Sequence, residues 1–260
     1  MIDTYHFREG DTPLLISVPH DGSHLPANIR EHMTPAGLML PDTDWHVAEL
    51  YDFARDLGAS MLVANYSRYV VDLNRSPADE DLYPGQVATG LCPTKTFSGE
   101  DIYTNGALSG DDKAQRVSAY WQPYHDRIES TLAAIHAEHG YALLWDAHSI
   151  PSVVPRLFDG ALPELNIGTN SGKSCAAGFE TSVVDVAMES PYSVAVNGRF
   201  KGGYITRHYG QPASNVHAIQ LEIAQRAYMD EASTAFDAEK ARRLRGTLRG
   251  LLQAYREAAC

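Results

Sequence analysis

The 260-residue chain has few cysteines, no long apolar run and a shortage of cations. Its three cysteines form no C-x-x-C pair, which argues against a disulfide framework and against a thiolate metal site. No stretch approaches the roughly 20 apolar residues that a membrane span requires. Lys and Arg total 21 against 33 Asp and Glu, and the net charge of −12 argues against nucleic acids and anionic membranes as partners.

Several familiar enzyme motifs are also missing. The sequence contains no G-x-S-x-G, H-E-x-x-H, P-loop or dinucleotide fingerprint, which disfavours serine hydrolases, zincins, nucleoside triphosphatases and dehydrogenases. The segment Met1–His6 lacks the basic start and apolar run of a secretory signal, so we predict a cytoplasmic protein. The length suits one domain over residues 1–260, and the oligomeric state stays open.

Short apolar runs alternate with helix-like segments along the chain. Each run has the length and composition of a strand that is buried on both faces. The predicted strands are Leu14–Val18, Met61–Ala64, Tyr69–Val71, Tyr141–Trp145, Leu165–Ile167, Val194–Val196 and Ile219–Ile223. The predicted helices are 44–57, 111–139 with a kink or break at Pro123, 175–188 and 238–257. This order predicts an α/β fold with a mostly parallel central sheet flanked by helices on both faces.

Two segments lack such periodicity. Ser76–Gly110 is rich in glycine and proline, and its Tyr83, Phe97 and Tyr103 favour an ordered lid over disorder. Asn197–Gly210 combines four glycines, which let the backbone fold closely, with three cations. Both segments are therefore candidates for ligand contact.

Polar residues follow several predicted strands at their carboxyl ends, where parallel α/β sheets bind ligands. His20 follows the first strand, and His148 follows the run that ends at Trp145. Neutral imidazole and carboxylate suit a catalytic zinc ion, which takes three protein ligands and leaves one position open. We therefore predict a Zn²⁺ site that includes both histidines, and another divalent ion would suit the same ligands.

The third ligand is predicted to be Asp44, at the start of a predicted helix near the same edge of the sheet. Its competitors for this place are Asp42, His46 and His24, and an aspartate there is also a common helix N-cap. Two further carboxylates, those of Asp72 and Asp146, are predicted to accept the second ring hydrogen of the ligand histidines and so fix their tautomers.

Glu222 is the predicted general base. It alternates with apolar Ile219, Leu221 and Ile223, and a strand covered on both faces rarely carries an unpaired charge. The alternative is a structural carboxylate that pairs with Arg207 or Arg226.

Several of these segments together resemble the N-formylglutamate amidohydrolase family, from about Leu14 to Glu222. They are Ser17–His20, Asp42–Trp45, Asp72–Arg75, Trp145–Ser149 and Asn197–Gly210. More distantly, the chain is similar to the phosphorylase/hydrolase-like fold of zinc carboxypeptidase and aspartoacylase, where an Asn-Arg pair binds a substrate carboxylate. Those relatives have an H-x-x-E ligand pair, whereas Ser23 stands three residues after His20.

The resemblance implies zinc-dependent hydrolysis of N-formyl-L-glutamate to formate and L-glutamate in histidine degradation. This small anionic substrate carries two carboxylates, which paired guanidinium groups bind well. We expect Asn74 with Arg75 to bind one carboxylate and Arg207 the other, with Arg199 or Arg68 as substitutes and Lys201 steering anions inward. The alternatives are hydrolysis of another N-acyl amino acid, such as N-formylaspartate or an N-acetyl analogue, and a non-catalytic, metal-containing dicarboxylate-binding protein.

Overall fold

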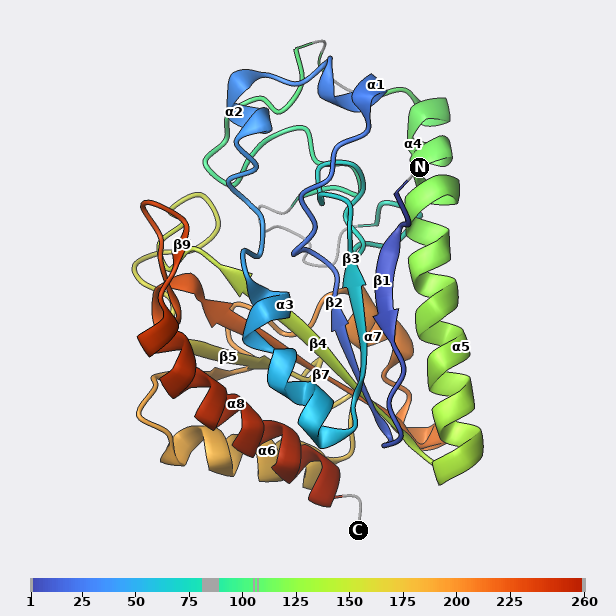
Figure 1. Ribbon diagram of the computed structural model, residues 1–260, viewed down its shortest axis with the longest axis vertical. Coiled ribbons are helices and arrows are strands. Elements are labelled where there is room, and N and C mark those ends of the chain that lie inside the picture. The colour runs from blue at the N-terminus through green and yellow to red at the C-terminus, as the bar shows by residue number, and fades with distance from the viewer. Residues whose placement is uncertain (1, 81–88, 105, 107, 259–260) are drawn as a thin grey trace.

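Seven strands form one mixed sheet in the computed structural model, which describes residues 2–80, 89–104, 106 and 108–258 (Figure 1). The order of the strands across the sheet is β1-β3-β2-β4-β7-β5-β6. They are β1 (Tyr5–Arg8), β2 (Leu14–Val18), β3 (Ser60–Ala64), β4 (Ala142–Ile150), β5 (Leu165–Gly168), β6 (Val194–Val196) and β7 (Val216–Ala224). The four central strands are parallel, while β1 pairs antiparallel with β3 and β5 antiparallel with β7.

Helices cover both faces of this sheet, as predicted. The α-helices are α1 (Ala27–Arg30), α2 (Pro35–Leu38), α3 (Val47–Leu50), α4 (Gly110–Arg116), α5 (Gln122–His139), α6 (Ala177–Glu189), α7 (Tyr204–Tyr209) and α8 (Ala238–Glu257). Short 3₁₀ segments are η1 (Asp52–Leu57), η3 (Pro212–Ser214) and η4 (Gln225–Ala227), and η2 (Val117–Trp121) is a π-helix. A two-stranded ribbon joins β8 (Met229–Asp230) to β9 (Ala235–Phe236).

The two faces of the sheet have separate apolar cores. On one face, α6 and α8 lie side by side and pack with α3 over alternate residues of the strands, such as Trp145 and Leu221 (Figure 1). On the other face, α5 and α7 pack over the intervening residues, such as Leu144 and Ala218. Within the described part of the chain, none of the helices combines the length and the apolar character needed to cross a membrane.

One predicted strand is wrong, and one strand of the sheet escaped prediction. Tyr69–Val71 forms a turn, because the Arg116 guanidinium binds the carbonyl oxygens of Tyr69 and Val70 at 3.2 and 2.9 Å in place of a neighbouring strand. The strand Tyr5–Arg8 lies at the edge of the sheet and is mostly half-buried, so it lacks the apolar run that marks the central strands.

The predicted helix over residues 44–57 is two short segments, α3 and η1. His46 has a φ of 63°, so α3 begins only at Val47, and Gly58 with a φ of 66° ends η1. Asp44 therefore lies outside the helix and is not its N-cap. This frees the Asp44 carboxylate to turn toward the carboxyl ends of the strands.

The long segment 76–110 is partly described. Phe97 and Tyr103 are buried, whereas Tyr83 lies outside the described residues. The backbone between Thr94 and Ile102 forms a tight turn in which the Ile102 N–H donates to the Thr94 carbonyl at 3.0 Å. This turn carries Phe97 to the edge of the cavity described below. A lid function stays a prediction.

Candidate metal and active site

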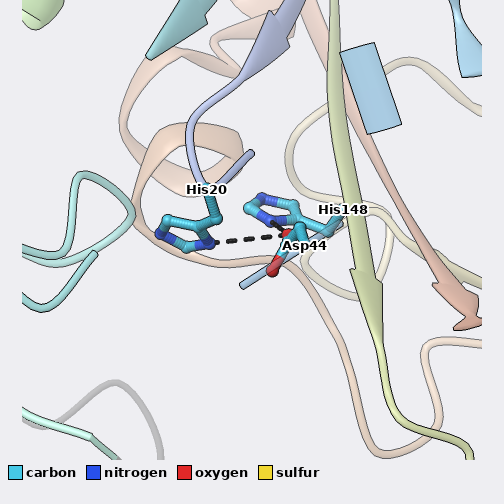
Figure 2. Close-up of side chains that lie close together, drawn as sticks. All are labelled: His20, Asp44 and His148. Atoms are coloured by element: carbon cyan, nitrogen blue, oxygen red, sulfur yellow. Dashed lines mark hydrogen bonds and ion pairs between the residues drawn. The ribbon is translucent and has the colours of Figure 1, made fainter. Parts of the chain in front are cut away.

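Two histidines from neighbouring parallel strands approach one carboxylate. His20 follows β2, His148 lies near the end of β4, and the Asp44 side chain lies between their rings (Figure 2). Asp44 Oδ2 is 3.0 Å from His148 Nδ1 and 3.7 Å from His20 Nδ1. All three residues are at most 3% exposed. The structure thus brings together the three residues that the sequence predicted as metal ligands.

The other nitrogen of each ring is held by a second aspartate. His20 Nε2 lies 2.8 Å from Asp72 Oδ1, and His148 Nε2 lies 3.0 Å from Asp146 Oδ1. A carboxylate only accepts hydrogen bonds, so the Asp72 contact favours the His20 tautomer with hydrogen on Nε2 and a lone pair on Nδ1. In His148 the Asn74 Nδ2 donor lies 2.8 Å from Nε2 and Asp44 Oδ2 lies 3.0 Å from Nδ1, so these contacts favour hydrogen on Nδ1, which a bound metal ion would displace. Asp72 and Asp146 thus each lie beside one of the two histidines, while their role in fixing the tautomers stays a prediction. Of the two Nδ1 atoms, that of His20 makes no hydrogen bond and that of His148 contacts Asp44.

The cluster fits a divalent metal ion. One ligand atom from each of His20, Asp44 and His148 lies within 4.8 Å of the other two. His20 Nδ1 is buried and makes no hydrogen bond, which is costly unless another group binds it. Two imidazoles and one carboxylate are a common ligand set for catalytic zinc and suit other divalent ions.

Arg68 completes the charge balance around the cluster. Its guanidinium lies 2.7 Å from Asp72 Oδ2 and 3.4 Å from Asp44 Oδ1, and it stacks on the ring of Phe97. Burial by itself would raise the pKa of the Asp72 carboxyl, but His20 and Arg68 hold that pKa well below its usual range. Arg68 lines the cavity, but its guanidinium is already engaged with the Asp44 and Asp72 carboxylates, which leaves it less available to bind a substrate carboxylate.

Glu222 lies beside the cluster on the adjacent strand. Its Cα pairs with that of His148 across β4 and β7, so the two side chains project from the same face of the sheet. Burial raises the pKa of Glu222 to about 8; the neighbouring His148 opposes this shift and Asp44 adds to it. A carboxyl group with such a pKa can both accept and donate a proton near neutral pH.

The Asn74 amide fills the space between His148 and α7. Its Nδ2 is 2.8 Å from His148 Nε2 and 3.2 Å from Asp146 Oδ2, and its Oδ1 accepts a hydrogen bond from the Ile205 N–H at 2.8 Å. A Cβ on Gly203 would lie 2.4 Å from the amide nitrogen, so only glycine permits this approach. Asn74 thus holds parts of the site together, and its binding of a substrate carboxylate stays a prediction.

A cavity of about 80 Å³ opens beside the cluster. His20, Asp44, His148 and Glu222 line it together with three arginines, Arg68, Arg75 and Arg199. Part of the wall is apolar and includes Phe97, Ile150, Leu157 and Phe200, and the rest is largely polar. A single water molecule needs about 10–15 Å³ of such space, so this cavity can hold several waters or a small ligand.

Besides Arg68, the cavity arginines Arg75 and Arg199 differ in how they are held. The Arg199 Nε donates to the Leu157 carbonyl at 2.8 Å, so this side chain also ties two loops together. One Arg75 nitrogen donates to Thr89 Oγ1 at 3.3 Å, and the Arg75 Nε is buried without a hydrogen-bond partner. Arg75 is therefore the better placed of the two to bind an anion.

The remaining sequence candidates lie away from the cavity. Arg207 donates to the Gly202 carbonyl at 2.7 Å and is not among the described residues that line the cavity. Asp42 accepts from the Phe97 N–H at 2.8 Å, which anchors the turn that carries Phe97. His46 Nε2 lies 2.9 Å from the Thr234 carbonyl oxygen, and His24 packs against the ring of Tyr66.

Three further polar residues around the site were not assigned a role from the sequence. Thr206 Oγ1 donates to Asp146 Oδ2 at 3.1 Å, and Gln220 Oε1 accepts from the Gly203 N–H at 2.6 Å. The Ser149 N–H donates to Asp44 Oδ2 at 3.1 Å. Thr206 and Ser149 lie in segments that the sequence singled out, and Gln220 alternates with apolar residues on the same strand as Glu222.

The fold and the site together define an α/β protein that carries a buried ligand set suited to a divalent metal at the carboxyl ends of its parallel strands. The family model described as N-formylglutamate amidohydrolase matches residues 12–229, and the chain belongs to this family.

Curated relatives and a solved structure agree with this assignment. The chain is 50% identical over 257 residues to an N-formylglutamate deformylase from Pseudomonas aeruginosa, covering 97% of this chain and 96% of the relative. It is 47% identical over 251 residues to an N-formylglutamate deformylase from Pseudomonas putida, covering 95% and 94%. A solved structure of N-formylglutamate amidohydrolase from Ralstonia eutropha JMP134 superposes over 100% of both chains with a TM-score of 0.83 and 24% identity.

Proposed function

We propose that this chain hydrolyses N-formyl-L-glutamate to formate and L-glutamate with a divalent metal, zinc by preference, held by His20, Asp44 and His148. The observation that carries the proposal is the meeting of these three residues beside Glu222 in one small cavity. The names of the relatives, which cover nearly the whole chain, supply the substrate. The proposal places the reaction in histidine degradation and in the cytoplasm.

The substrate is a small dianion, and the cavity offers cations to bind it. The Arg75 guanidinium, with its unpaired buried Nε, is assigned to one carboxylate. Arg199, which lines the same cavity, is assigned to the second carboxylate. Two fixed contacts of this kind would hold the formyl group in one orientation toward the proposed metal ligands and Glu222.

Glu222 is assigned the proton transfers. It accepts a proton from the attacking water, whose oxygen forms a bond to the formyl carbon. It then returns that proton to the amide nitrogen as the C–N bond breaks, which leaves formate and the free amine of L-glutamate. When bound at the cluster, a zinc ion supplies positive charge that polarises the amide oxygen and makes water more acidic.

The experiment that tests the function is a formate assay with purified protein. N-formyl-L-glutamate, N-formyl-L-aspartate and N-acetyl-L-glutamate are compared with and without a chelator, followed by re-addition of zinc, cobalt or manganese. We expect formate from N-formyl-L-glutamate above all, loss of activity with the chelator and recovery with metal. No product from any substrate in the metal-loaded protein would favour the non-catalytic dicarboxylate-binding alternative.

The ligand assignment has its own test. His20→Ala and His148→Ala should each lower the bound metal well below one equivalent, because each removes one of three protein ligands. His24→Ala is the matched control, since His24 packs on Tyr66 away from the cluster. Unchanged metal content in the first two variants would refute the ligand set.

A further inference from the structure

Two aromatic side chains of the long helical segment hold the backbone on either side of Asn74. The Trp121 Nε1 donates to the Arg75 carbonyl at 3.0 Å. His125 Nε2 lies 2.8 Å from the Leu73 carbonyl oxygen. A carbonyl oxygen only accepts, so the His125 Nε2 carries the hydrogen. The loop that carries Asn74 and Arg75 into the site is therefore held by two side-chain donors from one helix.

The His125 ring is fixed on both sides. It stacks on Trp121 with ring centroids 3.6 Å apart and an interplanar angle of 18°, and it is nearly parallel to the Tyr209 ring at 16°. The Tyr209 hydroxyl lies 3.0 Å from His125 Nδ1 and is the donor there, because Nδ1 carries no hydrogen. Burial lowers the pKa of His125 to about 3, so the ring stays neutral and keeps this tautomer.

A π-helix places both rings toward the loop. The π-segment η2 ends at Trp121, where the Gln122 N–H donates to the Val117 carbonyl five residues back, and α5 follows directly. Pro123 has no N–H to continue an ordinary helical ladder, which accounts for the change at this point. Trp121 and His125, four residues apart, then lie on one helix face. Single π-turns within helices are frequent at functional sites.

The loop Leu73–Arg75, held in this way, carries two residues of the site, Asn74 and Arg75. The Asn74 amide contacts His148 Nε2, and Arg75 lines the cavity. We propose that Trp121 and His125 are positioning residues, which fix the backbone of Leu73–Arg75 and thereby aim Arg75 at a substrate carboxylate. This inference rests on the proposed function for its substrate, but the geometry of the loop can be tested without turnover.

The test compares variants that remove or keep the donors. Trp121→Phe keeps an aromatic ring for stacking and loses the N–H, and His125→Leu loses the second donor. His125→Gln places an amide N–H near the position of Nε2 and should restore the contact. The matched control is Tyr51→Phe, which removes the buried acceptor of the Trp145 Nε1 hydrogen bond (2.9 Å) on the opposite face of the sheet.

Two measurements are made on each metal-loaded protein: steady-state kinetics with N-formyl-L-glutamate, and hydrogen exchange of a peptide that spans residues 72–76. We expect Trp121→Phe and His125→Leu to raise KM by about tenfold, the change that losing one well-made buried hydrogen bond produces, with a smaller change in kcat. The 72–76 amides should exchange faster in both. His125→Gln should lie near the wild type, and Tyr51→Phe should change neither KM nor this exchange.

The outcomes separate the inference from the proposed function. Absence of turnover in the wild type would end the proposed function, and local exchange at residues 72–76 would then decide the positioning role by itself. With an active wild type, unchanged KM in Trp121→Phe would overturn the inference, whether or not His125→Leu folds. Equal effects in Trp121→Phe and Tyr51→Phe would overturn it as well, since they would indicate general loss of stability.

Discussion

Consecutive residues of the same two strands serve two different faces of the sheet. In β4, Trp145 packs in the apolar core under α6 and α8, whereas Asp146 and His148 face the site. In β7, Leu221 lies in that same core, and Glu222 lines the cavity. Because side chains of a strand alternate between faces, stability and chemistry are carried by neighbouring positions on one backbone.

The apolar core under α6 and α8 and the site on the other face also differ in the free energy of burying their side chains. The face toward α6 and α8 buries apolar side chains, each of which stabilises the fold by about 1.5–3 kcal/mol. The site face buries the carboxylates of Asp44, Asp72, Asp146 and Glu222 with the guanidinium of Arg68. Burying like charges is unfavourable unless cations compensate them. The comparison therefore predicts that substitutions in the apolar core under α6 and α8 change mainly stability. Substitutions of the charged site residues should change mainly metal binding and turnover.

The largest effect is expected for Glu222→Gln. The amide keeps the size of the side chain but cannot accept the proton, so kcat should fall by about 100- to 10,000-fold. Bound metal and the thermal midpoint of the metal-loaded protein should stay close to the wild type. The measurement is formate release together with metal analysis, and full activity in this variant would remove Glu222 from the mechanism.

The neighbouring substitution Leu221→Ala should give the opposite pattern. Leu221 is fully buried in the other core, so the variant should lose about 2–5 kcal/mol of unfolding free energy. Its kcat per folded molecule should remain within about twofold of the wild type, because no site residue changes. Denaturant unfolding and active-site titration would check this. A large loss of kcat in fully folded protein would break the separation of the two faces.

Asp72→Asn tests how the ligand histidine is held. The Asp72 carboxylate accepts from His20 Nε2 at 2.8 Å and pairs with Arg68. Its replacement by an amide should weaken metal affinity by about 10- to 100-fold, the usual cost of losing a group that orients a ligand. Competition with a chelator of known affinity measures this. Unaltered affinity would show that the His20 ring needs no support from Asp72.

Arg75→Ala and Arg207→Ala test which cation binds the substrate. Since Arg75 lines the cavity and Arg207 does not, Arg75→Ala should raise KM by about tenfold or more, and Arg207→Ala should raise it less. Steady-state kinetics with N-formyl-L-glutamate decide between them. A larger rise in KM for Arg207→Ala would support Arg207 as the residue that binds a substrate carboxylate, as the sequence suggested.

The smallest effect concerns the pH dependence of stability in the metal-free protein. The pKa of Glu222 is raised to about 8 in the fold, so the folded state binds a proton more readily than the unfolded chain between the two pKa values. The contribution of Glu222 to stability is thus present at low pH and is lost as pH rises toward about 8. Gln at this position does not titrate, so the Glu222→Gln variant does not lose stability in this way. The difference between its thermal midpoint and that of the wild type should therefore increase as pH rises from about 6 to about 8 and then level off. A difference independent of pH would contradict the raised pKa.

Much of the central sheet could be predicted because the signal is local. The run Leu14–Val18 and the helix Ala238–Glu257 have the bounds that periodicity indicated. His20, His148 and Glu222 could be grouped because parallel strands bring their carboxyl ends to one edge. Their side chains do meet the same cavity. Where the apolar pattern reflects the burial within one segment, pattern and structure agree.

What the sequence by itself determined is therefore most of the buried strands, several of the helices that cover them, and the strand-end residues that face one edge. The tertiary structure decided three further features. Asp44 lies outside the helix because the left-handed His46 precedes its first residue, and Tyr69–Val71 does not join the sheet because Arg116 binds its carbonyl oxygens. Arg75, and not Arg207, lines the cavity. These outcomes depend on contacts between residues far apart in the chain, and hydrophobic periodicity carries no information about such partners.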